Sequence, residues 1–240
     1  MQKLSTVLFD YGNTLIAFGP DQQRAQAAAM TRVLHSAGLE VDEVKLTEIR
    51  KAQIMRPYHS GGKENVFREV CREIVELCTP DPDETLTRQL MRARQQAFLE
   101  SVTVAPAVKE LLERLKQRYR LGFLSNYPCT QSIVSSLQHL GLYDYFDAVV
   151  VSADVGFAKP HPRAYQQLID QMSIHDPSTA VYVGDNWLAD VQGAKRAGMR
   201  AIWLREHIPY EVFEPEDGDH PPDAEIRSLA ELENILLNLP

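Results

Sequence analysis

The stretch VLFDYGNTL, residues 7–15, carries apolar side chains directly into Asp10 and then into the turn-forming pair Gly12-Asn13. A continuous apolar run is typical of a parallel strand whose two faces are both covered. Open α/β sheets place their chemistry at the carboxyl ends of such strands. The stretch therefore predicts a buried strand that delivers Asp10 into a loop, where it is the leading candidate nucleophile. The alternative is an aspartate that only caps a turn or a helix.

Two kinds of hydrophobic periodicity divide the rest of the chain. Helical spacing of apolar residues holds from Leu15 to about residue 104, with a break at 57–62. The helices expected there cover residues 21–37, 46–55, a segment beginning at 64 and a segment around 86–97. Beyond Pro106, short apolar strands alternate with helices, which is the pattern of a parallel sheet wound on both faces. The strands expected there cover residues 121–126, 148–152, 181–185, 201–204 and an edge near 225–226, and the helices cover 106–118, a segment ending near 141, 162–172 and 229–237.

The expected fold is therefore α/β with an insertion. Residues 1–16 and 105–240 form a doubly wound, Rossmann-like parallel sheet, and residues 17–104 form an α-helical bundle inserted after the first strand. A bundle inserted there can cap the crevice at the strand ends and close over Asp10. The acidic loop 209–222 is expected to be a solvated excursion without an assigned role.

Composition narrows the classes of function. The 240 residues can bury a full core, and a hydrophobic content of 44% is that of a globular protein. The net charge of -8 repels phosphate backbones and disfavours nucleic acid as a partner. The three cysteines lack metal-ligand spacing, which suits a reducing compartment. Since no leader follows Met1 and no apolar run is long enough for a bilayer, we expect a soluble, cytoplasmic protein without a membrane partner.

Polar residues follow the predicted strands at the points where these strands end. They are Asp10, Ser125, Lys159 in GFAKPHP, and Asp185 and Asp190 in VGDNWLAD. Each alone has an ordinary structural explanation, because Ser125 or Asp185 can cap a helix and Lys159 can be a solvated loop charge. Parallel strands bring their carboxyl ends to one edge of the sheet. We therefore expect all of these side chains in one crevice.

With these motifs the chain resembles the haloacid dehalogenase-like (HAD) hydrolase superfamily, in the branch whose helical cap is inserted between the first and second motifs. The family's first motif, Asp-x-Asp-x-Thr, is matched by Asp10 and Thr14. Its Ser or Thr after the second strand is matched by Ser125, its lysine by Lys159, and its acidic GDxxxxD motif by Gly184-Asp185 with Asp190. The chain departs from the pattern at Gly12, where the phosphatases of the family carry an aspartate that acts as general acid and base.

A phosphatase of this kind assigns a task to each motif. A carboxylate nucleophile and a phosphate ester repel each other, so attack by Asp10 requires cations on both partners. Mg²⁺ prefers oxygen ligands, which Asp10, Asp185 and the backbone carbonyl of Gly12 can supply. Lys159 neutralises Asp10 and the phosphoryl group, and Ser125 binds phosphoryl oxygens. We expect Asp190 to orient Lys159 or metal-bound water, and the resemblance implies an aspartyl-phosphate on Asp10.

Substrate choice is expected to belong to the cap, and the substrate to be a small soluble phosphorylated metabolite. The break at 57–63 is a candidate substrate loop that places His59 and Lys63 over the crevice, with an ordinary polar turn as the alternative. Asn126, Tyr127 and His161 lie next to the motifs and are candidates for the pocket wall, Asn126 foremost.

Two other functions remain open at this point. One is a metal-independent dehalogenase, which also uses an aspartate nucleophile but attacks carbon. Asp185 disfavours it, because a metal site is unnecessary for displacing halide. The other is a catalytically silent binding protein that keeps the scaffold after losing the acid at Gly12.

Overall fold

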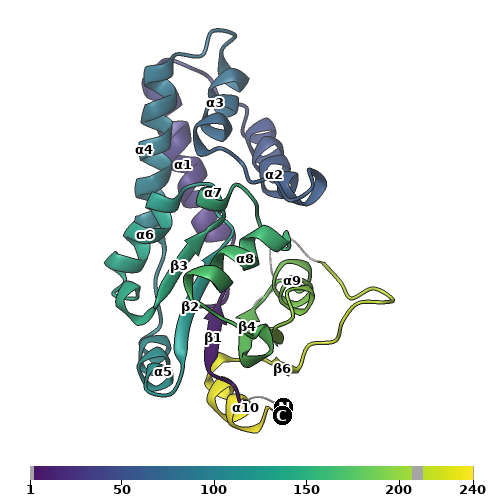
Figure 1. Cartoon of the computed structure of the whole chain (residues 1–240). Helices are drawn as coiled ribbons and strands as arrows, with labels where there is room; N and C mark the ends of the chain where they lie inside the picture. Colours follow the sequence, from purple (N-terminus) through teal and green to yellow (C-terminus); the bar gives the residue numbers. More distant parts are fainter. Residues whose placement is uncertain (1–2, 207–212, 240) are drawn as a thin grey trace.

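The computed structural model describes residues 3–206 and 213–239. Its sheet has six strands in the order β3-β2-β1-β4-β5-β6, and each strand is parallel to its neighbours (Figure 1). The strands are β1 (Thr6–Phe9), β2 (Arg120–Ser125), β3 (Ala148–Val151), β4 (Ala180–Gly184), β5 (Arg200–Leu204) and β6 (Ala224–Ile226). The chain builds outward from β1 on one side and then returns to add β4 on the other. The switch point of this topology lies between β1 and β4, where open sheets bind their ligands.

Helices cover both faces of the sheet because both faces of its strands are apolar. All four residues of β1 are buried, with Val7 and Phe9 in one hydrophobic cluster and Leu8 in another. The first cluster is completed by α5 (Pro106–Lys116), α6 (Thr130–His139) and α10 (Leu232–Asn238), and the second by α8 (Pro162–Gln171) and α9 (Gly193–Arg196). This arrangement confirms the doubly wound parallel sheet expected from the sequence. Shorter helical segments are η1 (Tyr143–Tyr145), α7 (Ser152–Val155), η2 (Pro177–Thr179), the π-helix η3 (Trp187–Gln192) and η4 (Leu229–Glu231).

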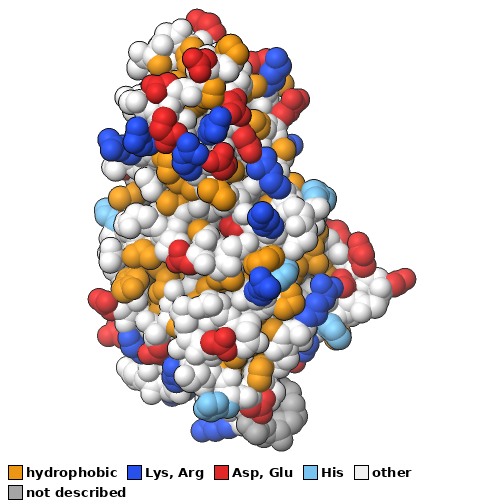
Figure 2. All heavy atoms as spheres, turned by 45° about the horizontal axis from the view of Figure 1, so that its top comes forward, with side chains coloured by type: hydrophobic (Ala, Val, Ile, Leu, Met, Phe, Trp, Pro, Cys, Tyr) orange, Lys and Arg blue, Asp and Glu red, His pale blue; other side chains and the backbone are white. Residues whose placement is uncertain are grey.

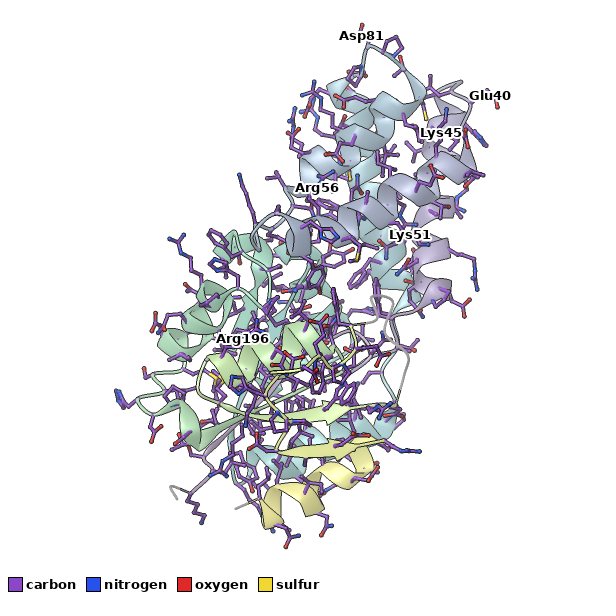
Figure 3. All side chains as sticks on the ribbon, turned by 90° about the vertical axis from the view of Figure 1, so that its right-hand side faces the viewer. Glu40, Lys45, Lys51, Arg56, Asp81 and Arg196 are labelled. Atoms are coloured by element: carbon purple, nitrogen blue, oxygen red, sulfur yellow. The ribbon has the colours of Figure 1, made fainter. Side chains whose placement is uncertain are left out.

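Of the five helices between β1 and β2, the first four stand beyond one end of the sheet (Figure 1). They are α1 (Pro20–Ser36), α2 (Glu43–His59), α3 (Phe67–Cys78) and α4 (Glu84–Ser101), and we call them the cap. Seen from the side, the cap meets the rest of the molecule at one end, and Glu40 and Asp81 mark its far end (Figure 3). The cap shares the hydrophobic cluster of β1, to which it contributes residues such as Met30 and Phe98. The division into domains at residues 16/17 and 104/105 stays a prediction.

Helix α2 extends further than the sequence indicates, and this expectation was wrong in its detail. The predicted helix 46–55 was to end before a break at 57–62, whereas α2 continues to His59 with Pro57 inside it. Proline lacks the N–H that would bond to the carbonyl of Gln53, four residues earlier. Here the side chain of Asn65 donates Nδ2–H to that carbonyl at 2.8 Å. The helix continues because a side chain from beyond its end takes the place of the missing donor.

The outer face of the cap mixes charges of both signs (Figure 2). Many of them pair with each other, including Arg56 with Glu73 at 2.8 Å and Arg72 with Glu76 at 2.9 Å. Exposed pairs of this kind add little stability. Within residues 3–206 and 213–239, no helix has both the length and the apolar character required to cross a membrane. Part of the acidic loop 209–222, namely 209–212, lies outside the described residues.

Candidate active site

Two aspartates emerge side by side from the centre of the sheet. Asp10 directly follows β1 and Asp185 directly follows β4, and these strands pair with Phe9 opposite Val183. The backbone N–H of Asp10 donates to the carbonyl of Val183 at 3.0 Å, which extends the ladder to the first aspartate. Both side chains are buried, at 8% and 6% exposure. The register of two parallel strands thus brings residues 175 positions apart to one point.

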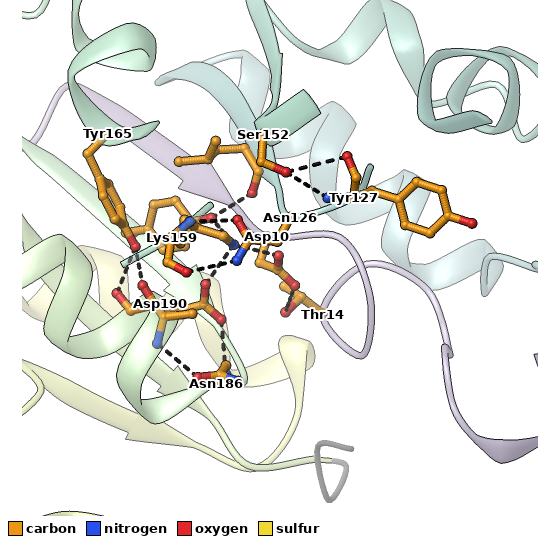
Figure 4. Close-up of polar contacts among 12 residues, drawn as sticks. Asp10, Thr14, Asn126, Tyr127, Ser152, Lys159, Tyr165, Asn186 and Asp190 are labelled. Atoms are coloured by element: carbon orange, nitrogen blue, oxygen red, sulfur yellow. Dashed lines mark hydrogen bonds and ion pairs between the residues drawn. The ribbon is translucent and has the colours of Figure 1, made fainter. Parts of the chain in front are cut away.

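Asp190 is brought to the same point by the tight turn after β4. A Cβ at Gly184 would lie 2.4 Å from Asp190 Cγ, so this approach requires glycine at position 184. Asp190 Oδ2 accepts the backbone N–H of Asn186 at 2.9 Å, and the Asn186 side chain accepts the N–H of Ala189 at 2.8 Å (Figure 4). These contacts explain physically why the motif has a glycine beside its first aspartate and a second aspartate five residues later.

Lys159 lies at the centre of the acidic group and is 2% exposed (Figure 4). Its Nζ donates to Asp10 Oδ1 at 2.7 Å, to Asp190 Oδ1 at 2.7 Å and to the hydroxyl of Tyr182 at 2.8 Å. Burial opposes a charge on Lys159, but the carboxylates of Asp10 and Asp190 outweigh burial and raise the pKa of Lys159 above its ordinary value. Lys159 is therefore a fixed cation with all three of its ammonium hydrogens in use.

The carboxylates of Asp10, Asp185 and Asp190 each place an oxygen within 4.8 Å of the others. Burial and the charges of Asp10 and Asp190 raise the pKa of Asp185 well above its ordinary value. Burial also raises the pKa of Asp190, to about 6, although Lys159 counteracts it. When all three are ionised, one ammonium leaves two negative charges unbalanced. A cluster of hard oxygen donors with this excess charge fits a divalent cation such as Mg²⁺.

Three further motif residues complete the core end of the site. Thr14 donates its hydroxyl to Asp10 Oδ2 at 3.3 Å. Ser125 is the last residue of β2 and lines the cavity described below. Gly12 also lines it, and a Cβ at this position would lie 3.2 Å from the Cβ of Phe18. A side chain at position 12 therefore requires only a small displacement of Phe18.

A cavity of about 200 Å³ lies between the sheet and the cap. Its core end is lined by the motif residues Asp10, Gly12, Ser125, Lys159, Asp185 and Asp190, and its cap end by residues such as Gln26, Arg50, Gln53, Glu64, Arg94 and Tyr127. Typical pockets for drug-sized ligands have volumes of about 300–1,000 Å³. The size of this cavity therefore suits a small molecule.

Asn126 lines the cavity, but its amide is occupied. Its Oδ1 accepts the backbone N–H of Lys159 at 2.7 Å, and its Nδ2 donates to the Lys159 carbonyl at 2.9 Å (Figure 4). Both ends of the amide thus hold the backbone from which the central cation projects. The contacts give Asn126 a positioning role, and substrate binding by its side chain stays a prediction. Tyr127, the other candidate beside Ser125, also lines the cavity.

Three candidates for the pocket wall lie outside this cavity. His59 and Lys63 are exposed and are not among the residues that line it. The segment between α2 and α3 is bonded to the core, with Glu64 N–H donating to Gly156 O at 3.0 Å and Ala158 N–H to Gly62 O at 2.8 Å. His161 accepts the N–H of Arg163 at the start of α8 and stacks on Phe157 at 4.1 Å. The structure therefore does not bring these three residues to Asp10.

Two polar residues of the site were not predicted from the sequence. Tyr182 in β4 holds Lys159 and donates its hydroxyl to Leu124 O at 2.8 Å, yet in sequence it resembles an ordinary core tyrosine. Arg94 in α4 is buried at 9% exposure. It follows Leu90 by four residues, so it falls on the apolar stripe of its helix, and this spacing was the available signal.

Comparisons with known proteins agree with the motifs. The family model described as haloacid dehalogenase-like hydrolase matches residues 7–204. A glyceraldehyde 3-phosphate phosphatase of Methanopyrus kandleri is 28% identical over 237 residues, which cover 98% of this chain and 98% of that protein. A protein of the same name from Methanothermobacter thermautotrophicus is 36% identical over 206 residues, which cover 85% of this chain and 87% of that protein.

Solved structures share the whole fold. A 2-haloacid dehalogenase from Pseudomonas syringae pv. Tomato superposes with a TM-score of 0.76 at 27% identity, covering 99% of this chain and 100% of that one. A hydrolase from Bacillus subtilis bound to magnesium superposes with a TM-score of 0.70 at 22% identity, covering 98% of this chain and 99% of that one. The second likeness shows the fold alone. The relatives named above are phosphatases, whereas the first structure is that of a 2-haloacid dehalogenase. The choice between these two reactions therefore depends on the chemistry of the site.

Proposed function

Since the chain belongs to the haloacid dehalogenase-like hydrolase family, we propose that it is a Mg²⁺-dependent phosphatase acting on a small soluble phosphate ester. The observation that carries this proposal is the charge of the site. Three buried carboxylates, from Asp10, Asp185 and Asp190, surround one ammonium, from Lys159. A divalent cation balances the negative charge that Lys159 leaves uncompensated. Such a cation also neutralises charge on a phosphate ester.

Asp10 is the proposed nucleophile. One of its carboxylate oxygens forms a bond to phosphorus while the ester P–O bond breaks. This leaves an aspartyl-phosphate and an alkoxide, which takes a proton from water to become the alcohol. Water then cleaves the aspartyl-phosphate, returning Asp10 and releasing inorganic phosphate. Thr14 and Lys159 each hold one oxygen of Asp10, which fixes the carboxylate for in-line attack.

The other residues bind and orient. The ammonium of Lys159 stabilises negative charge on the transferred phosphoryl group. Its hydrogen bonds to Asp190 and Tyr182 keep it in place. Ser125 lines the cavity, and its hydroxyl would donate to a phosphoryl oxygen. Asp10, Asp185 and the carbonyl of Gly12 would hold Mg²⁺, which neutralises charge on the phosphate when bound. The cap supplies the rest of the cavity and thereby selects the substrate.

A metal-independent dehalogenase is the second candidate, and the structural likeness at 27% identity favours it. In displacement of halide the attacked carbon carries no anionic oxygen, and the charge of the nucleophile passes to the leaving halide. A phosphate ester instead carries negative charge on the attacked group itself, so a divalent cation is needed for it and not for the dehalogenation. Asp185 then has no task that would offset its burial beside two other carboxylates. The charge of the site thus supports the phosphatase over the dehalogenase. A catalytically silent protein would have no need of the ordered contacts between Lys159 and Asp10.

A turnover assay separates these functions. The purified protein should release phosphate from small phosphate esters, with glyceraldehyde 3-phosphate in the first panel, and EDTA should abolish this release until Mg²⁺ is restored. Asp10→Asn should lose turnover without losing its fold, whereas Asp144→Asn, a matched change at an exposed aspartate, should not. Release of chloride from 2-chloropropionate in EDTA, with no phosphate release, would establish the dehalogenase instead. No turnover of either class across both panels would favour the silent protein.

A further inference from the structure

The cap end of the cavity holds two buried donors for which the described part of the chain offers no acceptor. Arg94 from α4 is 9% exposed and Gln26 from α1 is 1% exposed, and both line the cavity. Among the described residues, neither Arg94 Nη1 nor Gln26 Nε2 has a hydrogen-bond partner. Buried polar groups in folded proteins are nearly always paired, so each exception requires a reason.

The contacts of Gln26 determine which of its amide atoms is unpartnered. One amide atom receives both Arg94 Nε–H at 3.3 Å and the hydroxyl of Tyr127 at 3.4 Å. Only an oxygen can accept from these donors, so this atom is Oε1 and the amide nitrogen faces away from them. The two unpartnered atoms, on Arg94 and Gln26, are therefore both donors. The group that would satisfy them is an acceptor.

The guanidinium of Arg94 also has no counter-ion in the described part of the chain. It lies 5.4 Å from the centre of the Phe67 ring and donates to Gln26. By contrast, Arg56 makes bonds of 2.9 and 2.8 Å to Glu73 at the surface of the cap (Figure 3). A buried cation with no anion is unfavourable, and arginine suits planar or phosphate oxyanions in particular.

The acidic residues that line the cavity are engaged elsewhere. Asp10, Asp185 and Asp190 gather around Lys159 at the core end. Glu64 accepts from Ser152 and from the N–H of Asn65. Arg50, which also lines the cap end, donates Nη1–H to Gln23 O at 2.9 Å and adds a second positive charge there. The cavity is therefore acidic at its core end and cationic at its cap end.

We propose that the cap end binds a second anionic group of the substrate, a carboxylate or a phosphate, through Arg94 and Gln26. The ester phosphate then lies at the core end, between Asp10 and Ser125. The substrate class is a short-chain phosphate ester that carries a further oxyanion, since a cavity of about 200 Å³ leaves no room for a long spacer. This inference rests on the proposed function, because it names the substrate class of the same site.

Binding of probes that cannot be hydrolysed tests the inference without turnover. Propylphosphonate carries one anionic group, 3-phosphonopropionate adds a remote carboxylate, and propane-1,3-bisphosphonate adds a remote phosphonate. In calorimetric titrations with Mg²⁺, at least one of the two doubly anionic probes should bind about 10- to 100-fold more tightly than propylphosphonate, as expected of a charge-assisted hydrogen bond in a buried site. The doubly anionic probe that binds more tightly identifies the second group as carboxylate or phosphate.

Variants on one helix provide the control. Arg94→Met should remove the preference for the doubly anionic probe while leaving the affinity for propylphosphonate within about twofold, because only the cap-end contact is lost. Arg92→Met removes the same charge from an exposed position of α4 and should keep the preference. Arg94→Lys keeps the charge but loses the planar fork, so it should keep part of the preference.

The outcomes separate this inference from the proposed function. Equal affinities for all probes in the wild type, or a preference that survives in Arg94→Met, would overturn the inference. If Arg94→Met does not fold, the ratio of the wild-type affinities for the doubly and singly anionic probes, and its reduction in Arg94→Lys, still test the inference. A preference of the expected size without any phosphate release would count against the phosphatase alone. Phosphate release with equal probe affinities would count against the second anion site alone.

Discussion

Removal of the ammonium of Lys159 tests whether it balances the carboxylates around it. Lys159→Met keeps much of the length of the side chain but leaves Asp10, Asp185 and Asp190 together without a cation. Lys159 is 2% exposed and lies 2.7 Å from two carboxylate oxygens, so solvent cannot replace it. Removing one partner of a buried pair costs about 3–5 kcal/mol.

For a chain of this size, each kcal/mol shifts the midpoint of thermal unfolding by about 2–4 °C, so the variant should unfold about 6–20 °C below the wild type. The measurement is thermal or urea unfolding at pH 7.5 in EDTA. Addition of Mg²⁺ should raise the midpoint of Lys159→Met more than that of the wild type, because the variant has one positive charge fewer. Lys51→Met, at an exposed lysine of α2 (Figure 3), should change the free energy of unfolding by less than about 0.5 kcal/mol. A loss below about 1 kcal/mol in Lys159→Met would refute this account of the site.

Three further predictions concern two other residues of the cavity, Gly12 and Glu64, and Tyr182, which holds Lys159. Gly12→Asp should accelerate cleavage of alkyl phosphates more than that of p-nitrophenyl phosphate, because an acid that protonates the leaving oxygen contributes about 10²–10⁴-fold. The control is Gly12→Ala, which introduces only the Cβ 3.2 Å from Phe18. If the dependence of the rate on leaving-group pKa does not change in Gly12→Asp, another acid protonates the leaving group. Burial raises the pKa of Glu64 above its ordinary 4.5 despite the hydrogen bonds from Ser152 and Asn65. The contribution of the Glu64 carboxyl group to stability is therefore fully present below pH 4.5, and it is lost as pH rises through the pKa of the folded state. The free energy of unfolding of Glu64→Gln should therefore rise relative to that of the wild type as pH is raised from about 4.5 to 8, by at most about 1.4 kcal/mol per pH unit. Urea titrations that show the same difference at every pH would contradict the raised pKa. Tyr182→Phe removes the hydroxyl that accepts from Lys159 Nζ and donates to Leu124 O, which should cost about 1–3 kcal/mol in urea unfolding. Tyr143→Phe at an exposed tyrosine should be neutral.

The fold was predictable because its sequence signals are local and repeated. Each of the strands β1 to β5 contains a short apolar run, and the runs of β1 to β4 precede helical patterns, so the order of these elements follows from periodicity. The extent of α2 was not predictable in this way. Pro57 indicates a break, and the group that compensates for it, the amide of Asn65, lies beyond the end of the helix. A side chain brought back by the tertiary fold thus overrides the local rule.

The core end of the site was predictable for a topological reason, and the cap end was not. Asp10 and Asp185 come directly after parallel strands and Ser125 is the last residue of one, and such strands end at one edge whatever surrounds them. No comparable rule says which face of a cap helix meets the cavity. His59 and Lys63 were chosen for their chemistry in a break. Backbone bonds join 62–64 to 156–158, and Glu64 of this segment lines the cavity, whereas His59 and Lys63 are exposed and do not line it. Arg94 was not singled out because its helix carries other arginines. Its spacing of four residues from Leu90 nevertheless placed it on the row of apolar residues that faces the core.

The opposite charges of the two ends connect metal binding with substrate binding. Without a cation, the excess negative charge of Asp10, Asp185 and Asp190 repels a phosphate, whereas Arg94 and Arg50 attract an anion regardless of the metal. A substrate with two anionic groups can therefore be held in one direction only, with its ester at the metal end. Removal of Mg²⁺ should weaken binding of every phosphonate probe. The fold-difference between the wild type and Arg94→Met should remain for the doubly anionic probe that binds more tightly, because that contact is made at the other end of the cavity.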